Sequence, residues 1–184
     1  MIYKIDTSMD MIIVNFTQQI FDDALFSLEE ATKLEPNKEP FKCWKYCTWS
    51  IVASAMCMES FITGHLKFLE DQVDSSIWRS YERESIKLSG NKKGFFSKLK
   101  LIELITNSTI INTGDLNWDN IQDTIKLRND IIHFNRNDIY NSINQTNAEN
   151  GVKACKNLVE KIDHALNLPH PSSTPWITKT KSNL

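Results

Sequence analysis

The chain has 184 residues, of which 41% are hydrophobic and 24% are charged, and its formal net charge is -2. This length is enough for one globular domain with a real core and too short for two well-built domains. The slightly acidic balance excludes the overall basic character of a protein that coats nucleic acid. Any contact with nucleic acid must therefore be local.

The hydropathy pattern predicts a cytoplasmic protein without a membrane anchor. No stretch approaches 18 uncharged apolar residues, and the N-terminus MIYKIDTSMD carries acids where a signal peptide has a basic region. Its four cysteines lie among apolar residues, which favours free, buried thiols in a reducing compartment. Neither the spacing of Cys43 and Cys47 nor that of the four histidines is typical of a metal site, so we expect no metal and no cofactor.

Apolar residues recur at intervals of three and four, and Gly and Pro are scarce, which predicts an all-α fold. After an N-terminal extended segment over residues 1–14, helices are expected at about 15–34, 41–72, 76–88, 95–106, 118–134 and 147–168. The expected architecture is an up-and-down bundle of five or six helices in one domain, residues 15–168. Residues 169–184, rich in Pro, Ser, Thr and Lys, are expected to form a flexible tail.

The predicted helix at 118–134 has an unusual face. At about 100° per residue, most of its apolar side chains and Arg128 fall on one arc. Asn129 and His133 lie one turn apart on the neighbouring edge, while Asp123 and Asp130 are expected to face solvent. A guanidinium within an apolar arc is unfavourable unless it meets a carboxylate, a phosphate or several carbonyls.

Two interpretations of Arg128 compete. It can form a structural ion pair with Glu59, leaving His133 an ordinary half-buried histidine. Alternatively, it can bind a phosphodiester. His133 would then transfer protons, and Asn129 would orient either the histidine or the phosphate. On an ideal helix Arg128 and His133 point about 140° apart. Both would reach one phosphate only if the arginine bends across, the helix distorts, or two subunits share the site.

The stretch R-N-D-I-I-H, residues 128–133, resembles the R-x(4–6)-H signature of the HEPN superfamily (higher eukaryotes and prokaryotes nucleotide-binding domains), in which a polar residue follows the arginine. SIVASAMCMESFITGHL resembles the second helix of those bundles, which leads to an acidic residue, here Glu59. The resemblance spans about residues 41–165. It implies a homodimeric, metal-independent endoribonuclease with Arg128 and His133 catalytic and Asn129 and Glu59 supporting.

The same resemblance implies an RNA substrate, a role in growth arrest or phage defence, and an antitoxin or activating partner. Possible RNA-binding residues are Arg136, Asn137, Lys126, Lys92 and Lys93, although a charge run such as that around Lys92 is usually a solvated surface. One alternative is a non-catalytic HEPN-like module that binds a nucleotide, an RNA or a partner protein. Another is a helical interaction protein with a core ion pair. Motifs of phosphate-loop ATPases, dinucleotide oxidoreductases and zinc proteases are absent from the sequence.

Overall fold

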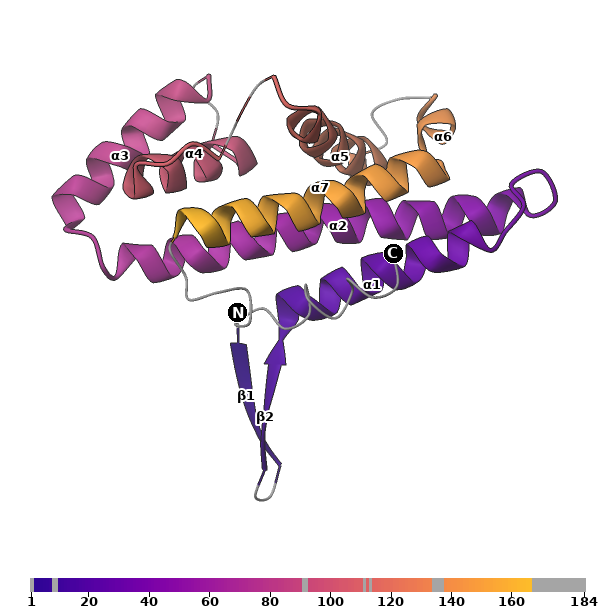
Figure 1. Ribbon diagram of the computed structural model, residues 1–184, viewed down its shortest axis with the longest axis horizontal. Coiled ribbons are helices and arrows are strands. Elements are labelled where there is room, and N and C mark those ends of the chain that lie inside the picture. The colour runs from indigo at the N-terminus through magenta and orange to yellow at the C-terminus, as the bar shows by residue number, and fades with distance from the viewer. Residues whose placement is uncertain are drawn as a thin grey trace. The chain divides into compact units, whose positions relative to one another are not determined.

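A computed structural model of the chain describes residues 2–7, 10–90, 93–110, 112, 114–133 and 138–166. Apart from one N-terminal β-hairpin, the regular elements of this part of the chain are helices, which confirms the all-α expectation for the body of the protein (Figure 1). The described residues form seven helices instead of five or six. The additional helix is a single turn, α6 (Ile139–Ser142), in the segment that sequence indicated as a polar break.

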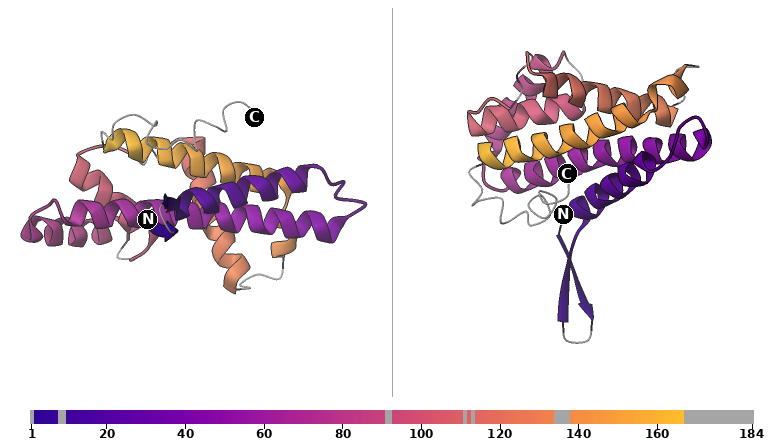
Figure 2. Two further views of the ribbon diagram at one scale, coloured as in Figure 1. Left: turned by 90° about the horizontal axis from the view of Figure 1, so that it is seen from below. Right: turned by 45° about the vertical axis from the view of Figure 1, so that its right-hand side comes forward.

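The hairpin pairs β1 (Ile2–Thr7) with β2 (Asp10–Asn15) in antiparallel register, from Ile2 opposite Asn15 to Thr7 opposite Asp10. Both strands are rich in β-branched residues, which favour extended backbone. The hairpin leads directly into α1 (Phe16–Thr32), as Figures 1 and 2 show.

The contacts within the chain define two compact units. Unit 1 comprises the described residues of Met1–Met58 and Asp115–Asn157, and unit 2 those of Glu59–Gly114 and Leu158–Leu184. Two long helices, α2 (Pro40–Glu70) and α7 (Gln145–Ala165), contribute residues to both units. The expected single domain over residues 15–168 stays a prediction, and the expected tail lies outside the described residues.

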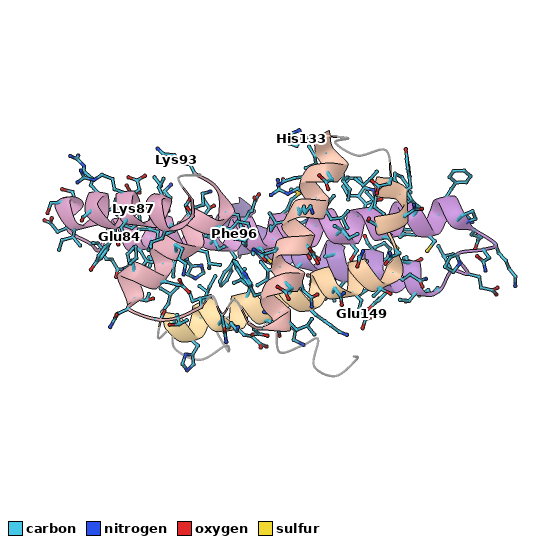
Figure 3. The ribbon with its side chains drawn as sticks, turned by 90° about the horizontal axis from the view of Figure 1, so that it is seen from above. Glu84, Lys87, Lys93, Phe96, His133 and Glu149 are labelled. Atoms are coloured by element: carbon cyan, nitrogen blue, oxygen red, sulfur yellow. The ribbon has the colours of Figure 1, made fainter. Side chains whose placement is uncertain are left out.

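In unit 1, α1 runs alongside the first part of α2, and the two helices are joined at residues 33–39 (Figures 1 and 2). α5 (Leu116–His133) crosses the first part of α7 steeply (Figure 3). The side-chain amide of Gln145 donates to the carbonyls of Ala31 and Leu34, at 2.6 and 3.3 Å, and so ties the start of α7 to the end of α1. The core of this unit is apolar and includes Phe21, Cys47, Ile51, Met58, Ile121, Ile125, Val152 and Cys155.

Unit 2 is built on α3 (Ser75–Leu88) and α4 (Phe95–Thr106), with the ends of α2 and α7. Asp74 caps α3, because its carboxylate accepts the backbone N–H of Ser76 at 2.8 Å. The buried carboxylate of Glu103 accepts the N–H of Ile110 at 2.7 Å and pairs with Lys100 at 2.6 Å. These bonds fix the loop that follows α4. In the described part of the chain no helix is long and apolar enough to cross a membrane.

Candidate functional site

The helix that carries the motif begins and ends close to where sequence places it. α5 runs from Leu116 to His133, against an expected 118–134, and Asp115 at its start accepts the N–H of Asn117 at 3.0 Å. It is a regular α-helix throughout that range. The helix distortion that would bring Arg128 and His133 together is therefore absent from residues 116–133.

Arg128 lies on the side of α5 that faces the core of unit 1. Ile121, Thr124 and Ile125, which precede it by seven, four and three residues, are all buried. Arg128 itself is half-buried, and its Nε atom is shielded from solvent. Long cationic side chains in such positions commonly pack their aliphatic stem on apolar surface. Glu59 is half-buried on α2 in unit 2, and its pairing with Arg128 stays a prediction.

His133 is exposed and is the last residue of α5 (Figure 3). Asn129, one turn earlier, is half-buried, and Lys126 beyond it is exposed. Residues three and four apart on a helix are neighbours, so these three side chains follow one edge of α5. Because the helix is regular, the side-chain directions of Arg128 and His133 differ by about 140°. One chain by itself presents the two motif residues on different sides of α5.

The other residues expected to bind RNA fall in two groups. Arg136, Asn137 and Lys92 lie outside the described residues. Lys93 is exposed just before α4 in unit 2 (Figure 3). Two further lysines, on α4, are engaged within the chain: Lys98 donates to Thr63 at 3.0 Å and Lys100 pairs with Glu103.

A polar cavity that the sequence did not indicate lies in unit 1 between α5, α6 and α7. We call it the α5 cavity. Its volume is about 200 Å³, and eight of the nine described residues that line it are polar. The lining residues are Asn120, Asp123, Thr124, Lys126, Leu127, Asp130, Ser142, Asn147 and Asn150.

Two side chains that line the α5 cavity are held in place by hydrogen bonds to backbone carbonyls. The Thr124 hydroxyl donates to the carbonyl of Asn120 at 2.6 Å, and the Asn147 amide nitrogen donates to the carbonyl of Ser142 at 2.8 Å. The side-chain oxygen of Asn147 is thereby oriented as an acceptor. Asp130 is only 8% exposed, which corrects the expectation that it faces solvent. The helical wheel failed for Asp130 because α6 and α7 supply polar neighbours on that side of α5.

In the sequence, this cavity corresponds to polar residues that recur along one side of α5 and of α7. Asn120, Asp123 and Asp130 recur on α5 at intervals of three and seven, and Asn147 and Asn150 repeat the pattern on α7. Such stripes usually mark solvated faces, so spacing alone did not distinguish a cavity from a surface. Within the described chain, no three His, Cys, Asp or Glu side chains gather as a metal site.

None of the protein-family models, curated proteins or solved structures compared with the chain matches it. A function must therefore be inferred from the residues of α5 and from the geometry around them.

Proposed function

We propose that this protein is a metal-independent endoribonuclease of the HEPN type that acts as a homodimer. The observation that carries the proposal is the placement of the two motif residues on one regular helix. His133 is exposed at the end of α5, and Arg128 is half-buried along its core-facing side. A histidine exposed at a helix end is accessible to a substrate, and a half-buried arginine is held in position.

The chemistry explains why two chains would be needed. Attack by a ribose 2′-hydroxyl requires a base to accept its proton, an acid to protonate the leaving 5′-oxygen, and positive charge on the phosphorane. One His133 supplies one proton-transfer role at a time. Because one regular helix points Arg128 and His133 apart, a partner's α5 is the simplest source of the missing groups. Two chains would contribute both proton-transfer groups and an arginine clamp without a metal ion.

In this arrangement each of the remaining residues has a role. Asn129, one turn from His133, would orient the imidazole or the phosphate, and Glu59 would support Arg128 from α2. Lys126, exposed on the same edge of α5, would contact the RNA backbone, and Arg136, Asn137, Lys92 and Lys93 would extend that contact. Cytoplasmic growth arrest or phage defence, with an antitoxin or activating partner, belongs to the same proposal.

The test compares the wild type, His133→Ala and His164→Ala on total RNA in the presence of EDTA. His164 is the matched control, because it is also an exposed histidine near the end of a helix. The wild type and His164→Ala should cleave and leave 2′,3′-cyclic phosphate ends, whereas His133→Ala should not. DNA, which lacks the 2′-hydroxyl, should stay intact. Cleavage of DNA, or an equally active His133→Ala, would overturn the proposal.

A mixing experiment tests the composite site. Wild-type and His133→Ala chains are unfolded together, refolded in different ratios and assayed at constant total protein. If each site needs both His133 residues, activity should fall with the square of the wild-type fraction. A linear fall would mean that one chain holds a complete site. Light scattering on the same samples gives the oligomeric mass.

The α5 cavity favours one alternative, a non-catalytic HEPN-like module that binds a nucleotide, an RNA or a partner protein. Its polar lining is suited to a small hydrogen-bonding ligand and requires no chemistry at His133. Binding of RNA or nucleotide by a well-folded wild type that cleaves nothing, with loss of binding in Asn150→Ala as well as in Arg128→Ala, would favour this function.

A further inference from the structure

His133 lies on α5 beyond the edge of the α5 cavity that Lys126 forms. Lys126 lines the cavity, and His133 follows it by seven residues, so their side-chain directions differ by only about 20°. Seven residues of α-helix span about 10 Å. Asp130, a further lining residue, lies between them. An RNA strand with a phosphate at His133 would therefore have a neighbouring base within reach of the cavity.

The size of the cavity limits what it can hold. Its volume of about 200 Å³ is below the roughly 300 Å³ at which pockets for drug-sized ligands begin. A single planar ring system suits this space, and the sugar and phosphate of a nucleotide would lie outside it. Single-stranded RNA offers such rings, because its bases can turn away from the strand and be read on their edges.

The charges of the lining favour hydrogen-bond donors over anions. Among the described lining residues, two are carboxylates, Asp123 and Asp130, and one is a cation, Lys126. Asp130 is largely buried, and a buried carboxylate accepts hydrogen bonds more strongly than one in water. The oriented oxygen of Asn147 adds another acceptor. These acceptors favour a neutral ligand that carries an amino group over a phosphate.

Asn120 and Asn150 supply the complementary groups. Each carries an adjacent donor and acceptor in its side-chain amide. Asparagine pairs with adenine through one donor and one acceptor, and aspartate accepts from the amino group of cytosine. Adenine, cytosine and guanine all carry an exocyclic amino group, and uracil does not.

We propose that the α5 cavity binds one amino-bearing nucleobase of the RNA next to the cleaved phosphate, and disfavours uracil there. The choice of RNA as the source of the base rests on the proposed function. The binding of the base itself does not, because it follows from the size and the acceptors of the cavity.

The first test uses nucleosides without phosphate, so that it does not depend on cleavage. Adenosine, cytidine and uridine are titrated into the full-length protein, and binding is followed by protein-detected NMR. Adenosine or cytidine should bind at least about tenfold more tightly than uridine. Asp123→Asn and Asn150→Ala should each remove most of that preference. Equal binding of all three nucleosides, or binding of none of them, would overturn the proposal.

Two matched controls test whether the preference depends on the cavity, and not on changing an acid or an asparagine anywhere on the same two helices. Asp119→Asn changes a carboxylate one turn earlier on α5, and Asn157→Ala changes an asparagine two turns later on α7. Neither residue lines the cavity, so both variants should keep the preference of the wild type. Loss of the preference in either control would also count against the proposal.

A second test uses short RNAs that differ only in the bases beside a mapped cleavage site. Uracil at the position read by the cavity should slow cleavage about tenfold in the wild type, and Asn150→Ala should reduce this difference. Selective nucleoside binding without RNA cleavage would leave the cavity proposal standing and reject the nuclease. Cleavage without base preference, in both the wild type and Asn150→Ala, would reject the cavity proposal and leave the nuclease standing.

Discussion

Gly151 of α7 lies so close to Thr124 of α5 that a Cβ atom on the glycine would come within 3.3 Å of the threonine Cγ2. The threonine is held in place, because its hydroxyl donates to the carbonyl of Asn120 at 2.6 Å. This close approach brings α7 against the motif helix and positions Asn147 and Asn150 beside the cavity.

Gly151→Ala should therefore destabilise unit 1 despite the better helix propensity of alanine. The propensity gain is about 1 kcal/mol, and overpacking a well-packed core costs about 1–3 kcal/mol. We expect a net loss of up to about 2 kcal/mol, measured by urea unfolding. In a Thr124→Ser background the closest atom is gone, so Gly151→Ala should become stabilising. The same effect in both backgrounds would show that the contact with Thr124 does not limit packing.

Glu103 should be a main support of unit 2. Glu103→Ala leaves the buried N–H of Ile110 without its acceptor, which costs about 1–3 kcal/mol, whereas Glu103→Gln keeps an oxygen in place and should cost less. Glu84→Ala, at an exposed position on α3 (Figure 3), should change the unfolding free energy by no more than about 0.5 kcal/mol. Thermal unfolding of the three variants checks this order. Equal losses in the alanine and glutamine variants would mean that the charge, and not the acceptor, is what matters.

The buried thiol of Cys47 should make stability fall at alkaline pH. Burial, with Cys43 beside it, raises the pKa of Cys47 from 9.0 to about 12. The folded state therefore keeps a proton that the unfolded state loses above pH 9. The stabilisation is fully present below pH 9 and declines by about 1.4 kcal/mol per pH unit as pH rises toward 12.

The measurement is urea unfolding of the wild type and Cys47→Ala between pH 7.5 and 10.5. The alanine variant lacks this group, so its stability should decline less steeply and the difference between the two proteins should narrow above pH 9. Parallel declines would contradict the raised pKa. Thiol labelling at pH 8 should likewise be slow in the native protein, because all four cysteines are buried and free.

Arg128→Met should leave the melting temperature unchanged or raise it, and should abolish RNA cleavage. Methionine keeps the stem that covers apolar surface and removes a charge held near the core, which is often neutral or stabilising when the charge serves function. Circular dichroism gives the melting temperature. A fall of several degrees that Arg128→Lys restores would favour the core ion pair with Glu59 and return His133 to an ordinary surface residue.

The positions of the helices were predictable, because the apolar period of α2 and the prolines at 36 and 40 define where helices end and begin. The helix predicted at residues 41–72 is α2, Pro40–Glu70, and the others agree within a few residues. The short α6 was not predictable. Its four residues carry no full helical period, and a sequence rich in Asn and Asp is typical of loops.

The candidate site was less predictable than the fold, since its surroundings come from distant segments. Asp130 is buried where its position on the wheel indicated solvent, and Ile132, an apolar residue of the same helix, is 51% exposed. Both differences arise near the end of α5, where neighbouring elements and not helical period decide which face is covered. The α5 cavity combines three helices, and no single stretch of sequence contains it.

The hydrogen bond from Gln145 to Ala31 joins residues 114 positions apart. Unit 1 can therefore be completed only late in the synthesis of the chain. On the ribosome α1 and the first part of α2 emerge early, yet the segments that complete their unit follow only after residue 114. The nascent chain must keep the apolar faces of Phe21 and Ile51 shielded until α5 and α7 arrive. Because such distant closure is slow, translation should favour early binding of a chaperone to this first helical pair.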